Sequence, residues 1–213
     1  GYNSLYFNTT GQENVAIGKD ALGSNTTADN NTAVGYNALG ANTTGTRNTA
    51  VGYASLDANT TGDYNTAMGY SALGSCTTGT RSVAVGYEAL RDHSTGSDNT
   101  AVGYHALLST TTGYDNTALG NRALQDNSTG FRNTAVGDFS GQNVSTGDNN
   151  TTVGHNAGNS ITSGDNNVII GSSSNVSEGN AIRQYVLGYN LGSKGNSTFF
   201  VGGSSGAYNE ANS

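Results

Sequence analysis

The sequence predicts an all-β protein, a parallel β-solenoid or β-roll built from 17-residue coils. One observation is a glycine that returns at a constant interval, from Gly1 through Gly18 to Gly188, without insertion or deletion. A second is the same order of apolar and polar residues inside each interval. Self-similarity at a short fixed period is typical of repeat architectures, in which each unit packs mainly against its neighbours. The third observation is the composition: 32 Gly, no Pro and only 33% hydrophobic residues argue against an ordinary globular core.

The repeating unit reads G-Y-x-A-L-x-x-N-T-T-G-x-x-N-T-A-V, and its first glycine defines the coil. Position 17 is always apolar, whereas position 5 is Leu and position 16 is Ala through the earlier part of the chain. After Gly1, the coil-defining glycines are Gly18, Gly35, Gly52, Gly69, Gly86, Gly103, Gly120, Gly137, Gly154, Gly171 and Gly188.

Unit positions 14 to 17 are expected to form a short strand, because β-branched residues alternate there with small ones. Positions 4 and 5 are expected to begin a weaker second strand, while the glycines and their Asn and Thr neighbours supply the turns. Each strand would pair in parallel with its equivalent in the next coil, about 4.8 Å away. Identical residues would therefore stack in ladders along the solenoid.

One Leu and one Val per coil would make a thin hydrophobic core, and small cores are marginal. Either Asn and Thr ladders fill the interior, or the chain associates with copies of itself. The small residues at position 16 would allow a neighbouring backbone to approach closely. For this reason, and because of the resemblance to trimeric fibre proteins given below, we expect a homotrimer, either intertwined or side by side.

The pattern divides the chain into three parts. Residues 1–137 hold coils of the unit given above, whereas in residues 138–187 glycine replaces the position 5 leucine and apolar character moves to position 8, which indicates variant coils with a shifted core. Residues 188–213 contain the apolar patch Phe199-Phe200-Val201 and are expected to form a cap or a junction, because end coils expose unpaired edges. Because the sequence starts in mid-repeat, we expect a fragment or a processed piece.

Charge and cysteine content exclude several classes of partner. The formal net charge is −7, and no basic patch is present to neutralise phosphates, so we expect no nucleic-acid binding. The apolar runs are too short to span a bilayer, so we expect no membrane insertion. The single Cys76 excludes an intrachain disulfide framework.

The residues that could bind metal fit structural roles better. His93, His105 and His155 fall on different ladders, whereas a zinc site needs three or four converging ligands. Oxygen ligands repeat at residues 147–150 and 164–167, as calcium would require, but turns explain these segments more simply. We expect no metal and no cofactor.

A pair of carboxylates is the strongest catalytic candidate. Asp98 and Asp115 stack at position 13 in adjacent coils, a spacing that could serve hydrolysis. Arg81 and Arg132 flank them on the same ladder, which favours cross-coil charge pairing. An enzyme would also need a non-repeating cleft with convergent polar groups. We therefore expect no catalytic residue and no enzyme.

Position 2 carries an unbroken run of tyrosines that could contact a glycan. Aromatic faces with phenol groups suit partly polar ligands such as sugars, although the same ladder could stiffen a sheet or fill a trimer interface. The Thr-Thr pairs at positions 9 and 10 could organise water as in ice-binding solenoids, but adjacent strand residues point to opposite faces. The tyrosines of this ladder are Tyr36, Tyr53, Tyr70, Tyr87 and Tyr104.

The units at residues 31–39 (N-T-A-V-G-Y-N-A-L) and 48–56 (N-T-A-V-G-Y-A-S-L) resemble repeats in tail-fibre and structural proteins of tailed phages, marine and cyanobacterial phages above all. Residues 82–86 (S-V-A-V-G) are similar to head repeats of trimeric autotransporter adhesins, which fold as trimeric β-rolls with a shorter unit. The resemblance covers nearly the whole chain. It implies a trimeric, elongated, host-facing fibre and carries over no catalytic residue.

We therefore expect a structural and adhesive segment of a phage tail fibre, located in the virion tail fibre or otherwise extracellular. The expected partners are further copies of the chain, other tail-fibre or baseplate proteins, and host-surface carbohydrate. A bacterial surface adhesin or appendage subunit and an ice-binding β-solenoid remain the alternatives.

Overall fold

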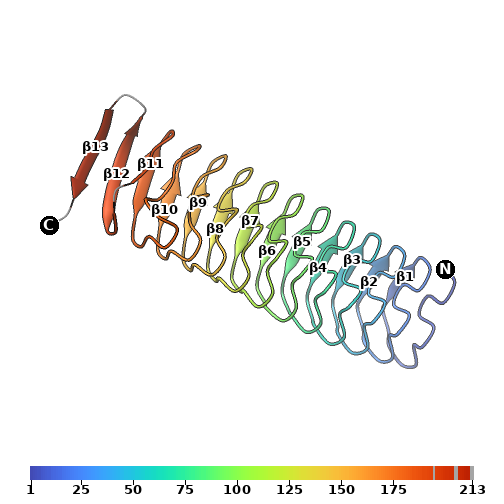
Figure 1. Ribbon diagram of the computed structural model, residues 1–213. Coiled ribbons are helices and arrows are strands. Elements are labelled where there is room, and N and C mark those ends of the chain that lie inside the picture. The colour runs from blue at the N-terminus through green and yellow to red at the C-terminus, as the bar shows by residue number, and fades with distance from the viewer. Residues whose placement is uncertain (194, 204–205, 212–213) are drawn as a thin grey trace.

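The computed structural model describes residues 1–193, 195–203 and 206–211, and it shows an elongated stack of coils with the termini at opposite ends (Figure 1). The described residues form one 13-stranded sheet in sequence order and no helix. The strands are β1 (Val15–Ile17), β2 (Thr32–Val34), β3 (Thr49–Val51), β4 (Thr66–Met68), β5 (Val83–Val85), β6 (Thr100–Val102), β7 (Thr117–Leu119), β8 (Thr134–Val136), β9 (Thr151–Val153), β10 (Val168–Ile170), β11 (Tyr185–Gly188), β12 (Thr198–Gly203) and β13 (Gly206–Ala211).

The strand register confirms the predicted solenoid. From β1 to β11 each strand pairs in parallel with the next at an offset of one repeat unit, as Ala33 does with Ala50. The final parallel step is shorter, because Tyr185 of β11 pairs with Phe199 of β12, and β13 then turns back antiparallel. Identical unit positions therefore stack along the molecule, and each strand from β1 to β11 begins at position 15, one residue later than predicted.

The predicted second strand at positions 4 and 5 is wrong, because this segment is a turn. Leu39 has a φ of 51° and Asn37 a φ of 55°, a left-handed backbone that an extended strand cannot contain. The Leu39 N–H donates to the Ser55 carbonyl of the next coil (3.1 Å), and the Gly40 N–H closes the turn on the Asn37 carbonyl (3.1 Å). The coils are therefore joined by one three-residue strand each and by stacked turns.

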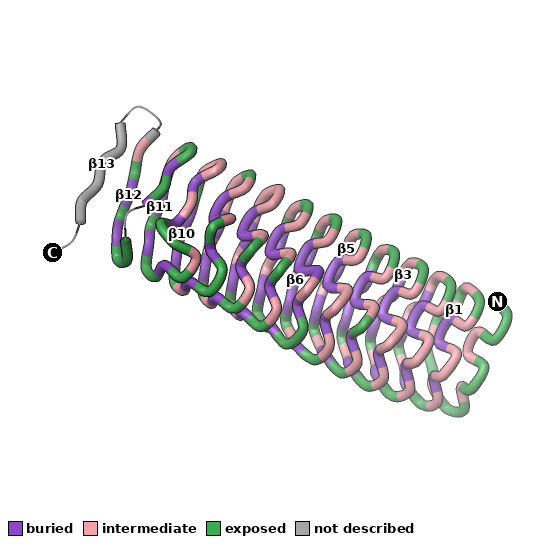
Figure 2. Tube along the Cα trace, viewed as in Figure 1, coloured by how far each residue is buried: buried purple, intermediate pink, exposed green. Residues whose placement is uncertain are grey.

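The hydrophobic core is made of Ala and Leu columns. Position 16 faces the interior, since Ala50 and its equivalents from Ala33 to Ala135 are fully buried, and it packs with the Ala and Leu of positions 4 and 5, such as Leu56. Buried residues recur in coil after coil along the stack (Figure 2). Positions 15 and 17 point the other way, as period-two alternation requires. Two expectations are therefore wrong: the Val at position 17 does not fill the core, and the small residues at position 16 form no outer face for a neighbouring backbone.

Asparagine columns fill the rest of the interior, which confirms one half of the predicted ladder filling. The Asn65 backbone N–H donates to the Asn48 Oδ1 (2.9 Å), and the Asn48 Nδ2 donates to the Gly62 carbonyl (2.8 Å). Both side chains are fully buried, so each amide satisfies a backbone group that water cannot reach. The threonine half is wrong, because the Thr43 hydroxyl lies at the rim and donates to the Thr60 carbonyl (3.0 Å).

The Asn column at position 8 is interrupted in the middle of the chain. Cys76 and His93 replace Asn, Thr110 follows, and all three side chains are fully buried. The His93 Nε2 keeps the bond that Asn makes, to the Gly96 carbonyl (2.7 Å), but its Nδ1 has no partner. The Thr110 hydroxyl and the whole Asn127 side-chain amide are also unpaired, so this stretch holds the weakest polar packing of the interior.

The variant coils exchange one core residue for another. Gly141 and Gly158 occupy position 5 with φ of 57° and 67°, and Val144 and Ile161 at position 8 are fully buried. A Cβ on Gly158 would lie 3.3 Å from the Ile161 Cδ1, so the position 8 side chain fills space beside the missing leucine. The division into residues 1–137, 138–187 and 188–213 stays a prediction.

Candidate functional sites

The tyrosine ladder lies on the outside of the solenoid. Its members follow the coil-defining glycines and remain 43–50% exposed. Neighbouring rings stack almost in parallel, with centroids 5.0 to 5.4 Å apart and planes 6° to 15° apart. The stacking follows from the coil spacing, and it presents ring edges and phenol groups to solvent at regular intervals.

The ends of the ladder carry charged or titratable groups. Lys19 lies 5.5 Å from the centroid of the Tyr36 ring, and the His105 ring stacks on Tyr104 with centroids 3.8 Å apart. The His105 Nε2 is 3.1 Å from the Glu88 carboxylate. Desolvation, with Glu88 beside it, raises the pKa of Tyr87 above its ordinary value. The Tyr87 phenol is therefore a neutral hydrogen-bonding group at physiological pH.

An aliphatic column runs beside the tyrosines. Position 17 precedes the coil-defining glycine and position 2 follows it, so the two columns are separated by a residue without a side chain. Met68 is 43% and Leu119 38% exposed, and the remaining members of the column are partly exposed. The strand face and the tyrosine ladder together form a long, partly apolar surface, which is unusual for a soluble monomer.

The Asp98 and Asp115 carboxylates are each engaged by an arginine. Arg81 binds Asp98 through two hydrogen bonds, from Nε (2.6 Å) and from Nη2 (2.7 Å), which lowers the pKa of Asp98. Arg132 lies 3.7 Å from Asp115. The predicted cross-coil charge pairing is confirmed, and the lowered pKa of Asp98 does not suit a general acid.

The other candidates are also dispersed. His93 is inside the coil, His105 is on the tyrosine ladder, and His155 lies edge-on to Phe139 with ring centroids 6.2 Å apart. Among the described residues no three His, Cys, Asp or Glu side chains gather as a metal site would require. The Asp148 Oδ1 accepts from the Phe131 backbone N–H (2.9 Å), so the candidate calcium segment holds the turn of the neighbouring coil.

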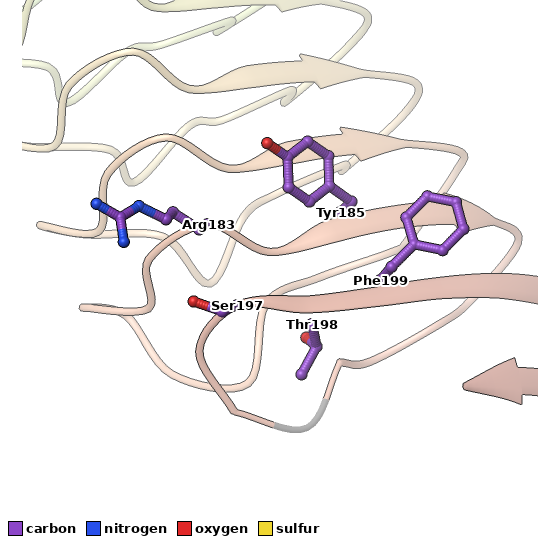
Figure 3. A pocket seen from close by; sticks show the side chains of 5 residues that line it. All are labelled: Arg183, Tyr185, Ser197, Thr198 and Phe199. Carbon is purple, nitrogen blue, oxygen red and sulfur yellow. The ribbon is translucent and has the colours of Figure 1, made fainter. Parts of the chain in front are cut away.

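Sequence reasoning missed a cavity near the C-terminus (Figure 3). It has a volume of about 480 Å³ and is lined by Arg183, Tyr185, Ser197, Thr198 and Phe199. Tyr185 and Phe199 occupy the outward strand position 15, which is Thr or Val in the preceding coils, and their ring centroids are 6.5 Å apart. This switch to aromatic residues and the shortened final coil are the signals that could have revealed it.

No family model, curated protein or solved structure matches the chain. No helix in the described part of the chain is long and apolar enough to cross a membrane. The candidate sites are therefore judged on their own geometry.

Proposed function

We propose that the chain is a rigid shaft segment of an elongated extracellular fibre of the phage tail-fibre type, with an adhesive surface. The observation that carries this proposal is the unbroken in-register stack of coils from β1 to β11. Each coil repeats the same hydrogen bonds and the same buried columns, so length can be added without changing the cross-section. A structure of this kind suits a spacer that holds a contact surface away from its base.

The fibre is a homotrimer in which the chains pack side by side. Position 16 is sealed inside each coil, so the packing surface is the outer strand face with its aliphatic column at position 17. Burying such a column against a copy of itself removes apolar area from water at about 25 cal/mol per Å². In this arrangement other tail-fibre or baseplate proteins join the ends of the trimer, and the edges of the tyrosine ladder remain available to host-surface carbohydrate.

Solution mass and shape test this proposal together. Light scattering should give three times the chain mass of 21.6 kDa, and small-angle scattering should give a rod. Met68→Lys and Leu119→Lys place charges on the aliphatic column and should dissociate the trimer while each chain stays folded by circular dichroism. A compact monomer of the unaltered chain would refute the fibre.

Ice binding is a second candidate, favoured by one specific observation. Thr and Val at positions 15 and 17 point outward from short parallel strands, as Thr49 and Val51 do, and so form a regular two-column array. The Thr-Thr pairs at positions 9 and 10 support it less, since the position 9 hydroxyl is bonded to the next coil. Thermal hysteresis of the unaltered chain tests this function separately from its solution mass.

A further inference from the structure

The C-terminal cavity lies where the regular 17-residue pattern ends. Elsewhere the outward position 15 carries Thr or Val, which gives a shallow and regular surface. Tyr185 and Phe199 put two aromatic rings there, 44% and 48% exposed, on the neighbouring strands β11 and β12. The rings are tilted by 49° to one another, so they form an open aromatic wall rather than a closed stack.

Polar groups line the other side of the same cavity. In Figure 3 the Arg183 guanidinium and the Ser197 hydroxyl both lie to the left of the Tyr185 and Phe199 rings, which line the same cavity. Among the described residues Arg183 has no carboxylate partner, in contrast to Arg81, which is paired with Asp98.

The backbone beneath the cavity is fixed by hydrogen bonds. The Ser197 N–H donates to the Ile182 carbonyl (3.0 Å), and the Ile182 N–H donates to the Asn196 Oδ1 (2.9 Å). These bonds join the two coils that carry the cavity. The lining side chains are therefore presented by backbone that does not have to be ordered when a ligand binds, which lowers the entropic cost of binding.

We propose that this cavity binds an acidic saccharide, one sugar ring that carries a carboxylate. The carboxylate pairs with Arg183, whose planar guanidinium can donate two parallel hydrogen bonds. The apolar C–H face of the ring packs on Tyr185 and Phe199, while a ring hydroxyl reaches the Ser197 hydroxyl. A volume of about 480 Å³ lies within the usual range for small-molecule sites and exceeds what one sugar ring needs.

The combination of groups distinguishes this ligand from simpler ones. A bare anion would use Arg183 and leave two exposed aromatic rings without a role, and a neutral sugar would use the rings and leave the guanidinium unpaired. The inference goes beyond the proposed fibre, because it depends on the local structure around β11 and β12. It requires that the chains of the proposed trimer pack along the strands before β11, so that the outward face of β11 and β12 stays open.

The test is a titration of the ¹⁵N-labelled full chain, followed by amide chemical shifts. The probes are glucuronate, galacturonate, glucose, galactose, acetate and sulfate. We expect saturable shifts from the uronates, confined to residues near the cavity, with at least a ten-fold weaker response to the neutral sugars. Acetate and sulfate should bind far more weakly than the uronates, because they cannot use the aromatic wall.

Matched variants separate the two halves of the site. Arg183→Gln should abolish the preference for uronates over neutral sugars, whereas Arg47→Gln, the same change at the same unit position far from the cavity, should leave it intact. Tyr185→Thr and Phe199→Thr introduce the residue that earlier coils carry and should weaken the uronates at least ten-fold. Equal binding of acetate and uronate, or no saturable shift from any uronate, would overturn the proposal, whatever the solution mass of the chain.

Discussion

The coil-defining glycines should be irreplaceable, and Gly69→Ala is the sharpest test. A Cβ on Gly69 would lie 2.2 Å from the Gly86 carbonyl oxygen of the next coil, and its φ of +142° is one that residues with a side chain rarely adopt. The backbone strain alone costs about 1–3 kcal/mol. Relief of the clash requires the coils that begin at Gly69 and Gly86 to separate locally.

The cost of that separation follows from the hydrogen bonds between the two coils. The nearest are those from the Gly86 N–H to Met68 (2.8 Å), from the Glu88 N–H to Tyr70 (2.9 Å) and from the Leu73 N–H to Ala89 (3.0 Å). At about 1 kcal/mol each, their loss brings the total to about 4–6 kcal/mol. For a chain of this size that lowers the melting temperature by about 10 °C or more.

Gly74→Ala is the matched control in the same coil. Its backbone is not in the left-handed region, and the equivalent position holds Asp57 and Arg91 in the flanking coils, so a side chain fits there. Thermal melting by circular dichroism measures both variants, and hydrogen exchange should locate the damage of Gly69→Ala between β4 and β6. Equal melting temperatures for the two variants would refute the close-approach reasoning.

Three further predictions concern single side chains. Thr110→Asn should raise stability by about 1 kcal/mol in denaturant melts, because an amide can restore the interrupted asparagine column at position 8. A loss of stability would show that this column does not need an amide at residue 110. Burial lowers the pKa of His93 from 6.5, so the unfolded chain binds more protons and stability should fall as the pH drops below about 6.5. His93→Asn should remove that part of the dependence of stability on pH. An unchanged pH dependence would contradict the role given to His93. Arg81 lowers the pKa of Asp98, so the pair stabilises the fold at pH values above the unfolded pKa of 3.8, and this stabilisation is lost as the pH falls through the folded pKa. Because the pair is exposed, Asp98→Asn should cost no more than about 1 kcal/mol of stability at neutral pH. A larger loss would reveal a structural role for Asp98.

The register could be predicted because it depends on spacing alone. A glycine repeated at one fixed interval determines which residues stack, and the Asn ladder inside the coil follows from the same spacing. Which residues of each strand point into the interior could not be predicted from the spacing. A three-residue strand has only one alternation, so Ala50 and Val51 are equally good candidates for the inside until the turns on either side are known.

The turn at position 5 could not be predicted, because the residue there is leucine in most coils. Leucine is rare at positive φ, and no sequence pattern indicates that Leu39 and its equivalents adopt it. The coils with glycine at this position, Gly141 and Gly158, hold the only local hint, because glycine accepts that backbone without strain.

The candidate sites also differ in how much of them the sequence could predict. The tyrosine ladder could be read from the unit, and its exposure needed the structure. The C-terminal cavity depends on the pairing of Tyr185 with Phe199, which the shortened final coil places side by side. The period of the repeat does not predict how β12 pairs with β11, so the sequence alone indicated only a cap or a junction at the C-terminus.

The central claim is that one 17-residue unit forms one interchangeable coil, and paired deletions test it most directly. Removal of residues 52–85, two whole coils, joins Val51 to Gly86 and preserves every ladder. The chain should keep its circular dichroism spectrum and cooperative melting, and small-angle scattering should show a rod about 10 Å shorter. Removal of residues 52–77 takes away less of the chain but shifts all later positions out of register, and it should disrupt the fold. If both deletions gave the same spectrum, melting and length, the coil account would be contradicted.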